Sequence, residues 1–225
     1  MRLIIFDCDG TLVDSQHMIV EAMTRAFSAR SLAQPDRHAV LNVIGLSLDE
    51  AIGRLADGAE AGDIRLLSQA YRAAFTELRS DPMLAEPLFP GALDGLRALA
   101  RQSDVFLGIA TGKSRRGVKK FLEHFDLSSY FSTIQTADDA PSKPHPAMID
   151  QAVADVGAES ANTVMVGDTS YDMIMAQQAS VCPIGVAWGY HPASELARAG
   201  ARTVVTDFPG LVDVIETLNP SRTAA

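Results

Sequence analysis

From residue 89 onward, short runs of apolar and β-branched residues alternate with stretches in which apolar residues recur every three or four positions. The short runs predict buried strands, and the longer spacing predicts helices with one apolar face. This alternation is typical of an α/β fold with a parallel sheet. Including one run at the N-terminus, the expected strands are residues 3–6, 105–110, 131–136, 163–166, 183–186 and 203–205.

Residues 15–88 interrupt this alternation. They contain no strand-like run and have the pattern of several amphipathic helices joined by loops near Pro35 and Gly45. We therefore predict an α/β core made of residues 1–14 and 89–225, with an all-helical cap domain, residues 15–88, inserted after the first strand. The chain would cross between the units twice, which makes the crossings a natural hinge. In the alternative arrangement, the helices pack on one face of the sheet.

Composition and charge narrow the class of protein. The 225 residues include 47% hydrophobic and 21% charged residues, the balance of an ordered globular protein. The formal net charge of −9 repels nucleic acid and anionic lipid. A basic cluster between Lys113 and Lys120 is more typical of a solvated helix face than of a nucleic-acid site.

The compartment and the partners follow from the same features. Cys8 and Cys182 have apolar neighbours in what we interpret as two different strands, which favours buried thiols in a reducing compartment over a disulfide. The sequence shows no signal-peptide pattern and no apolar stretch long enough to span a bilayer. We expect a cytoplasmic protein that has neither nucleic acid nor a membrane as a partner. The sequence itself sets no oligomeric state.

Polar side chains gather after four of the expected strands. The carboxyl ends of the strands in an open parallel sheet share one edge, and ligands bind there. Two carboxylates about 4 Å apart repel each other by roughly 4 kcal/mol at an effective dielectric near 20, so several of them together need a cation. Oxygen ligands suit Mg²⁺, which commonly shares carboxylates with a substrate phosphate. The residues concerned are Asp7, Asp9, Thr111, Gly112, Lys113, Lys143, Asp168 and Asp172.

Four segments in chain order resemble the four signatures of the haloacid dehalogenase superfamily. Residues 7–15 (DCDGTLVDS) resemble the first signature, and residues 110–113 (ATGK) are similar to the second. Residues 143–146 (KPHP) look like the third, and residues 167–172 (GDTSYD) look like the fourth. One Asp-Gly turn after a strand is common, but four ordered motifs are hard to obtain by chance. The resemblance implies a Rossmann-like parallel sheet core with an inserted helical cap.

The resemblance assigns the two residues that carry the chemistry. The first Asp of the first signature is the family's nucleophile, which makes Asp7 the residue that attacks phosphorus and forms an aspartyl phosphate. Asp9 would be the general acid and base, because it would protonate the leaving alkoxide and later deprotonate the attacking water. We infer that the chain already turns at Gly10, so that Asp9 faces the same site as Asp7. The competing interpretation is that Asp9 only caps a turn.

The resemblance also implies a magnesium site. Its ligands would be the side chains of Asp7 and Asp168 and the backbone carbonyl of Asp9. Asp172 would act beside the metal or through a water molecule. For each of these carboxylates taken alone, a surface salt bridge or a helix cap is the competing interpretation, which we keep mainly for Asp172.

The remaining site residues would bind the phosphate. Thr111 and the backbone amide of Gly112 would hold the oxygens of the transferring phosphoryl group. Lys113 would be an additional cation near the substrate. Lys143 would neutralise charge on the nucleophile and on the phosphate, a role that suits a compact ammonium group.

The helical insertion resembles the cap of phosphoglycolate phosphatases, β-phosphoglucomutases and related small-molecule phosphatases. Residues 45–49 look like the substrate-facing loop, whose mutase version carries an arginine where this sequence has Leu48. The fourth motif also differs from the Glu-Asp pair of the mutases, since Gly167 precedes Asp168. We therefore expect a Mg²⁺-dependent phosphatase that hydrolyses a small-molecule phosphate monoester, similar to phosphoglycolate phosphatase.

Three alternatives are open. A phosphomutase would need a cap cation for its sugar phosphate, and Arg25, Arg54 or Arg72 could supply one from other positions. A pyrophosphatase would use the same site. A non-catalytic phosphate-binding module would predict loss of the nucleophile or the lysine, whereas Asp7 and Lys143 are both present.

Overall fold

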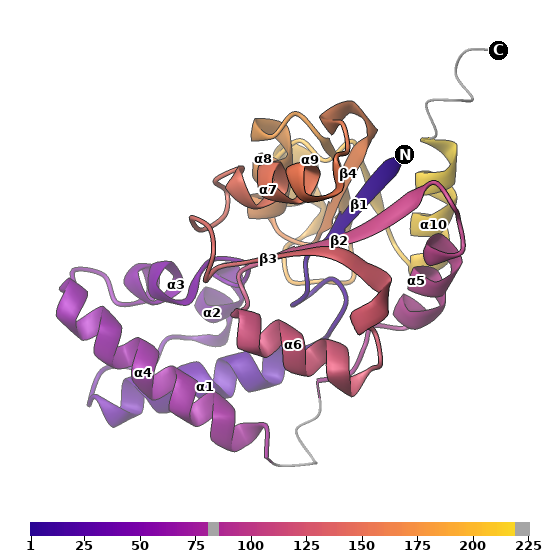
Figure 1. Cartoon of the computed structure of the whole chain (residues 1–225). Coiled ribbons are helices and arrows are strands. Elements are labelled where there is room, and N and C mark those ends of the chain that lie inside the picture. The colour runs from indigo at the N-terminus through magenta and orange to yellow at the C-terminus, as the bar shows by residue number, and fades with distance from the viewer. Residues whose placement is uncertain (81–85, 219–225) are drawn as a thin grey trace.

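A single six-stranded sheet forms the centre of the computed structural model, which describes residues 1–80 and 86–218 (Figure 1). Every pair of neighbouring strands is parallel, and the strand order is β3-β2-β1-β4-β5-β6. The predicted α/β fold with a parallel sheet is therefore confirmed. The strands are β1 (Arg2–Phe6), β2 (Val105–Thr111), β3 (Phe131–Thr136), β4 (Thr163–Gly167), β5 (Cys182–Val186) and β6 (Thr203–Val205).

Two strands continue one residue further than predicted, at the edge where the site lies. β2 includes Thr111, which pairs with Thr136 of β3. β4 includes Gly167, which pairs with Gly185 of β5. The backbone of these two motif residues is therefore held by the sheet ladder and not by a loop.

The cysteines are both free thiols, but one of them was placed wrongly. We expected Cys8 in a strand, whereas it is buried in the turn that follows β1. Its carbonyl accepts hydrogen bonds from the amides of Thr11 and Leu12 inside this turn, so it cannot take part in the sheet ladder. Cys182 begins β5 as expected and is only partly buried.

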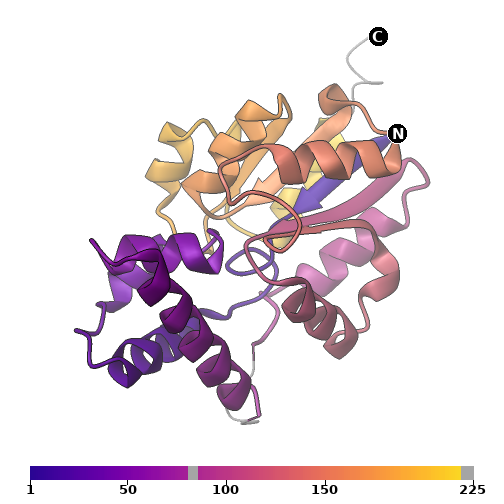
Figure 2. The same ribbon diagram turned by 60° about the vertical axis from the view of Figure 1, so that its left-hand side comes forward.

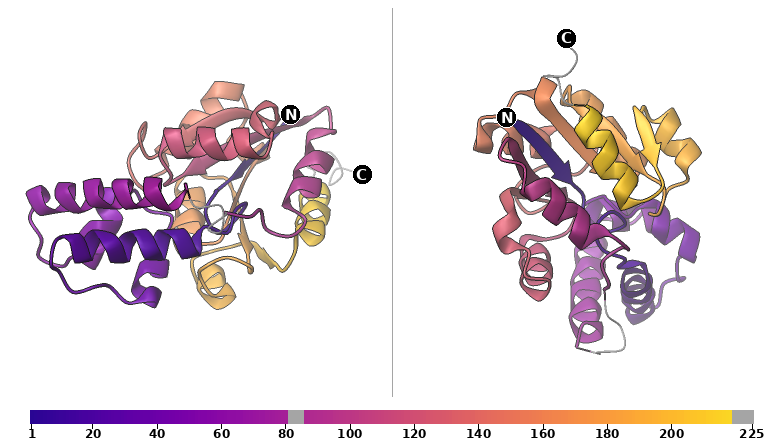
Figure 3. Two further views of the ribbon diagram at one scale, coloured as in Figure 1. Left: turned by 90° about the horizontal axis from the view of Figure 1, so that it is seen from below. Right: turned by 90° about the vertical axis from the view of Figure 1, so that its right-hand side faces the viewer.

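Helices cover both faces of the sheet (Figures 1 and 3). Alternate residues of β1 point to opposite faces, so that Ile4 and Phe6 belong to one apolar cluster and Leu3 and Ile5 to another. The first cluster includes residues of α5 (Ala92–Ala100), α6 (Arg115–His124) and α10 (Phe208–Thr217). The second includes residues of α7 (Ala147–Val156) and α8 (Ser170–Gln178), and α9 (Ala193–Arg198) contacts α8 and β5.

In the described residues between β1 and α5, four α-helices lie beside the edge toward which β1 points (Figure 2). The helices are α1 (Gln16–Ala29), α2 (Arg37–Asn42), α3 (Leu48–Leu55) and α4 (Ala61–Leu78). They share apolar clusters that are separate from those of the sheet, with buried members such as Met23, Ile52 and Leu67. In the described parts of the chain, no helix is long and apolar enough to cross a membrane.

The two segments that connect these helices to the sheet lie side by side. The amide of Asp14 donates to the carbonyl of Pro87 at 2.8 Å, and the amide of Phe89 donates to the carbonyl of Leu12 at 3.0 Å. Val13 and Leu88 form an antiparallel bridge between these bonds. The proposed cap, residues 15–88, therefore begins and ends where the two connecting segments are hydrogen-bonded to each other. The boundaries of the cap stay a prediction.

Replacing Ile52 by alanine tests this division into two units. Ile52 is fully buried among α1 to α4, and the cavity that alanine leaves is expected to cost about 2 to 5 kcal/mol of stability. If the four helices form a unit of their own, hydrogen–deuterium exchange will speed up across residues 16–78 and stay slow in the sheet. As a control, Ile4→Ala should weaken protection of the sheet. Equal loss in both regions of Ile52→Ala would contradict a separate cap.

Candidate active site

The predicted site residues meet at one edge of the sheet, beyond the carboxyl ends of the strands. Phe6 of β1 pairs with Ile109 of β2 and with Val166 of β4. The chain segments that follow these residues therefore leave the sheet close together, and the amide of Asp7 donates to the carbonyl of Val166 at 3.0 Å. The strand order changes direction here, because β2 and β3 lie on one side of β1 and β4 to β6 on the other. Open α/β sheets bind ligands at such a switch point.

The turn after β1 brings Asp9 to the same edge. The Cys8 carbonyl accepts hydrogen bonds from the amides of Leu12 and Val13 at 2.9 and 3.0 Å, which closes the turn. Gly10 has a φ of 89°, a backbone conformation that residues with a side chain rarely adopt. The predicted turn at Gly10 is confirmed.

Asp168 is held between two glycines. A Cβ atom added to Gly10 would lie 2.2 Å from Asp168 Oδ2, and one added to Gly189 would lie 2.1 Å from Asp168 Cβ. Its Oδ1 accepts a hydrogen bond from Thr11 Oγ1 at 2.8 Å, and its Oδ2 accepts one from the amide of Tyr190 at 2.9 Å. Burial raises the pKa of this carboxyl well above its ordinary value. The carboxylate is therefore fixed in position at an electrostatic cost.

Three buried carboxylates and one buried ammonium group form the centre of the site. One oxygen each of Asp7, Asp168 and Asp172 lies within 4.8 Å of the other two. Lys143 Nζ lies 3.0 Å from Asp7 Oδ1 and 2.6 Å from Asp172 Oδ1. Burial acts to lower the pKa of Lys143, but the charges of Asp172 and Asp7 outweigh it and raise that pKa. Lys143 is therefore charged and offsets part of the negative charge.

The remaining charge and geometry fit a divalent cation. Among residues 1–80 and 86–218, the buried side-chain oxygens and nitrogens without a hydrogen-bond partner are Asp7 Oδ2 and His191 Nε2. An unpartnered buried carboxylate oxygen is costly unless a cation or a ligand satisfies it. The donors around it are carboxylate oxygens, the kind that Mg²⁺ binds in proteins. These residues fit the predicted magnesium site.

Asp172 has partners on both of its oxygens. Its Oδ2 accepts hydrogen bonds from the amide and the hydroxyl of Thr169, at 3.1 and 2.7 Å, as part of the N-terminal cap of α8. Its Oδ1 faces Lys143. The helix cap that we kept as the competing interpretation is therefore present, and it orients Asp172 toward Lys143 within the acidic cluster.

Lys113 contacts the predicted general acid and base. Its Nζ lies 2.6 Å from Asp9 Oδ1 and 3.2 Å from Glu86 Oε1. The hydroxyl of Ser15 donates to the same Asp9 oxygen at 2.5 Å. Glu86 in turn accepts a hydrogen bond from Arg79 Nη2 at 2.8 Å. Burial acts to lower the pKa of Lys113, but the charges of Asp9 and Glu86 outweigh it and raise that pKa.

Sequence reasoning missed several of these contacts. Ser15 ends the first motif, and its spacing from Asp9 in a tight turn was the available signal. Glu86 had no such signal, because its role depends on where the second connecting segment lies. Trp188 and Tyr190 hold the site's loops. Trp188 Nε1 donates to the carbonyl of Thr11 at 3.0 Å, and the Tyr190 hydroxyl accepts from the amide of Ser15 at 3.0 Å.

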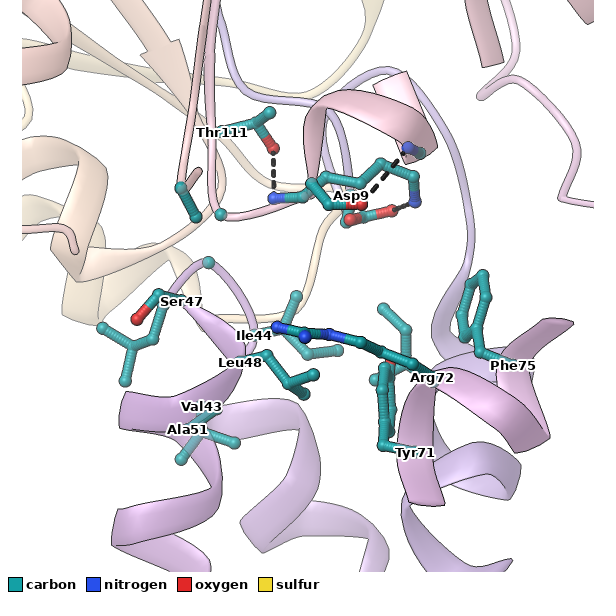
Figure 4. Close-up of a pocket in the computed structure, with 18 of the residues that line it drawn as sticks. Asp9, Val43, Ile44, Ser47, Leu48, Ala51, Tyr71, Arg72, Phe75 and Thr111 are labelled. Atoms are coloured by element: carbon teal, nitrogen blue, oxygen red, sulfur yellow. Dashed lines mark hydrogen bonds and ion pairs between the residues drawn. The ribbon is translucent and has the colours of Figure 1, made fainter. Parts of the chain in front are cut away.

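A cavity of about 350 Å³ lies between these residues and the helices α1 to α4 (Figure 4). On the sheet side it is lined by Asp7, Asp9, Thr111, Gly112 and Lys113. On the helical side it is lined by the loop at residues 45–49, which sequence reasoning had taken as the substrate-facing loop, and by residues of α4. The acidic cluster therefore opens toward a space that is large enough for an organic ligand.

The sequence as a whole is similar to known phosphatases. Residues 4–186 match the family model described as haloacid dehalogenase-like hydrolase. The chain is 39% identical to a Dickeya dadantii protein named probable phosphatase IndB, over 96% of this chain and 94% of that protein. It is 30% identical to the phosphoglycolate phosphatase of Photorhabdus laumondii, over 96% of this chain and 92% of the relative.

The fold is also found in solved structures. The crystal structure of a hydrolase from Pseudomonas syringae matches with a TM-score of 0.85 and 26% sequence identity. The match covers 96% of this chain and 99% of the other. The sheet and the helices α1 to α4 both lie within the matched length.

The acidic cluster predicts an unusual dependence of stability on pH. Burial raises the pKa of Asp7 to about 6 from its ordinary value of 3.8, although Lys143 opposes the rise. Asp7 in the unfolded chain ionises near pH 3.8, whereas in the folded protein it stays protonated up to about pH 6. The folded state therefore loses stability as the pH rises through this range, and the loss is complete above pH 6. In EDTA at pH 8, Asp7→Asn is expected to be roughly 2 to 3 kcal/mol more stable than the unsubstituted protein in urea unfolding.

At pH 5 this advantage should shrink by about half, since much of Asp7 is then protonated in the folded protein. Asp213→Asn, an exposed carboxylate on α10, is the matched control and should show no such gain at either pH. An Asp7→Asn protein that is less stable at pH 8, or whose advantage grows at pH 5, would contradict a destabilising charge on Asp7.

Proposed function

Because this chain belongs to the haloacid dehalogenase-like hydrolases and is a phosphatase of that family, we propose that it hydrolyses a small-molecule phosphate monoester through an aspartyl phosphate on Asp7, with Mg²⁺ as cofactor. The observation that carries the proposal is Asp7 itself. It is a fully buried carboxylate that lines the cavity, has one oxygen without a partner, and lies 3.0 Å from a charged lysine.

The first half of the reaction transfers the phosphoryl group to the protein. An oxygen of Asp7 attacks phosphorus, and the bond between phosphorus and the leaving oxygen breaks. Asp9 donates a proton to that leaving oxygen, so the product departs as an alcohol. Lys113 and Ser15 both contact Asp9 Oδ1 and so fix the position of its side chain.

The second half releases phosphate. The now ionised Asp9 takes a proton from a water molecule, whose oxygen attacks phosphorus and displaces Asp7. Thr111 and the amide of Gly112 would hold the phosphoryl oxygens, and Lys143 neutralises charge on Asp7 throughout. When bound by Asp7, Asp168 and the Asp9 carbonyl, Mg²⁺ would offset the charges of the carboxylates and the phosphate.

Residues 15–88 would act as a cap that closes over this site. Hydrogen bonds join the helices α1 to α4 and their loops to the sheet domain near the cavity. Ser142 Oγ accepts a hydrogen bond from the amide of Ser47 at 2.8 Å, and the Tyr171 hydroxyl donates to the carbonyl of Asn42 at 2.9 Å. Closure would exclude water while the aspartyl phosphate forms, and opening would admit water and release the products.

The three arginines that a phosphomutase could use to hold its sugar phosphate differ in whether they line the cavity. Arg25 pairs with Glu21, and Arg54 pairs with Glu50 outside the cavity, so neither arginine lines it. Arg72 does line the cavity. Arg72 is therefore the one of these three arginines that could hold the sugar phosphate of a mutase, and Arg79, which also lines the cavity, is paired with Glu86.

Asp7→Asn is expected to lower turnover by several orders of magnitude, because the amide cannot act as the nucleophile. The measurement is phosphate release from a panel of phosphomonoesters, pyrophosphate and β-glucose 1-phosphate, with MgCl₂ and with EDTA. Asp213→Asn again provides the control. Mg²⁺-dependent hydrolysis that survives in Asp7→Asn would refute the nucleophile, and glucose 6-phosphate formation without phosphate release would establish a mutase instead.

Gly112→Ala tests whether closure of the cap is required. A Cβ at this position would lie 2.4 Å from the Leu46 carbonyl oxygen and 2.6 Å from that of Gly45, so the loop of the cap would have to move away. We expect kcat/KM to fall at least tenfold, with little change in Tm. Gly62→Ala is the control, since a Cβ there meets no atom within 4 Å. An unchanged kcat/KM in Gly112→Ala would show that the closed contact is dispensable.

A further inference from the structure

The helical side of the cavity is mainly apolar (Figure 4). It is lined by Ile19 and Met23 of α1, by Ile44 and Leu48 of the loop and α3, and by Tyr71 and Phe75 of α4. The Tyr71 and Phe75 rings stack with their centroids 5.7 Å apart. Walls of this kind gain free energy by covering the apolar surface of a ligand. A very small or fully polar leaving group would leave these apolar side chains exposed to water.

One cation reaches into this apolar region. Arg72 extends from α4 across the cavity toward Ile44 and Leu48 (Figure 4). Within the described residues, no ion pair or side-chain hydrogen bond engages its guanidinium group, although its backbone carbonyl accepts one from Thr76. A guanidinium that lines a cavity without a partner is suited to bind an anionic group of a ligand.

The neighbouring charged residues of the helical side already have partners. Arg79 is paired with Glu86 at 2.8 Å. Asp49 accepts a hydrogen bond from the hydroxyl of Ser68 at 2.5 Å. Within the described part of the cavity wall, Arg72 is therefore the cation of the helical side that is left for an anionic group of the ligand.

We propose that the leaving group of the substrate is a bulky, mainly apolar body that carries one anionic group, and that Arg72 binds this group while the stacked Tyr71 and Phe75 cover the apolar body. This rests on the proposed function and adds the substrate class to it. The phosphate would bind at Asp7, Thr111 and Lys143, and the leaving group would extend into the cap. Glycolate and pyrophosphate lack the apolar body.

The test measures binding and turnover separately. Asp7→Asn, which cannot form the aspartyl phosphate, is titrated calorimetrically in MgCl₂ with phenyl phosphate, 3-carboxyphenyl phosphate, 3-sulfophenyl phosphate and phosphoglycolate. We expect the two anionic aryl esters to bind about tenfold tighter than phenyl phosphate, as for a charged hydrogen bond. Comparison of the two distinguishes a carboxylate from a sulfonate. Phosphoglycolate should bind more weakly than either.

Arg72→Gln in the same background should abolish the preference for the anionic esters. Arg65→Gln is the matched control, because Arg65 is an exposed arginine on the same helix and does not line the cavity. It should keep the full preference. Both substituted side chains are exposed, and equal Tm values would show that neither change disturbs the fold. In the active enzyme, Arg72→Gln should raise KM for the anionic esters much more than it lowers kcat.

Two results would overturn the inference. One is an undiminished preference in Arg72→Gln, and the other is tighter binding of phosphoglycolate than of all three aryl esters. The proposed function fails differently. If the unsubstituted protein released no phosphate from any ester, while Asp7→Asn still bound the anionic esters through Arg72, the subsite would stand and the phosphatase proposal would not.

Discussion

Mutual repulsion among Asp7, Asp168 and Asp172 is the constraint on which the other features of this site depend. The three carboxylates are buried within a few ångströms of one another, and Lys143 offsets only part of their charge. They stay together because the backbone gives each of them little freedom. Asp7 directly follows a central strand, and Asp168 is wedged between two glycines that have no room for a side chain. The fold thus maintains an electrostatic strain that a cation and a phosphate group would relieve.

A series of ion pairs connects Asp9 with the helices α1 to α4. Asp9 contacts Lys113, Lys113 contacts Glu86, and Glu86 contacts Arg79 at the C-terminal end of α4. Glu86 lies beside the second connecting segment, so the orientation of Asp9, the proposed general acid and base, depends on where that segment runs. A movement of the cap would therefore alter the contacts of Asp9 as well as access to the cavity.

Much of the site could be predicted because its signals are local. Asp7 and Asp168 directly follow strands and Thr111 ends one, and strand ends in a parallel sheet share an edge, so the meeting of these three residues could be expected from the sequence. The partner of Lys113 could not be predicted in this way. Sequence reasoning assigned it to the substrate, and its contact with Asp9 and Glu86 arises from the pairing of segments far apart in the chain. That the guanidinium of Arg72 has no partner among the described residues could not be predicted either, because it depends on which arginines of the helices α1 to α4 find partners.

The pairing of Val13 with Leu88 has a consequence for how such proteins diversify. The inserted helices leave the sheet domain and return to it at neighbouring points that are already hydrogen-bonded to each other. A change of length or sequence within the insertion therefore need not displace β1 or Asp7, the proposed nucleophile that follows it. Selection for a new substrate can act on the helical residues that line the cavity, including Arg72 and Leu48, while the residues proposed to act on the phosphate stay unchanged.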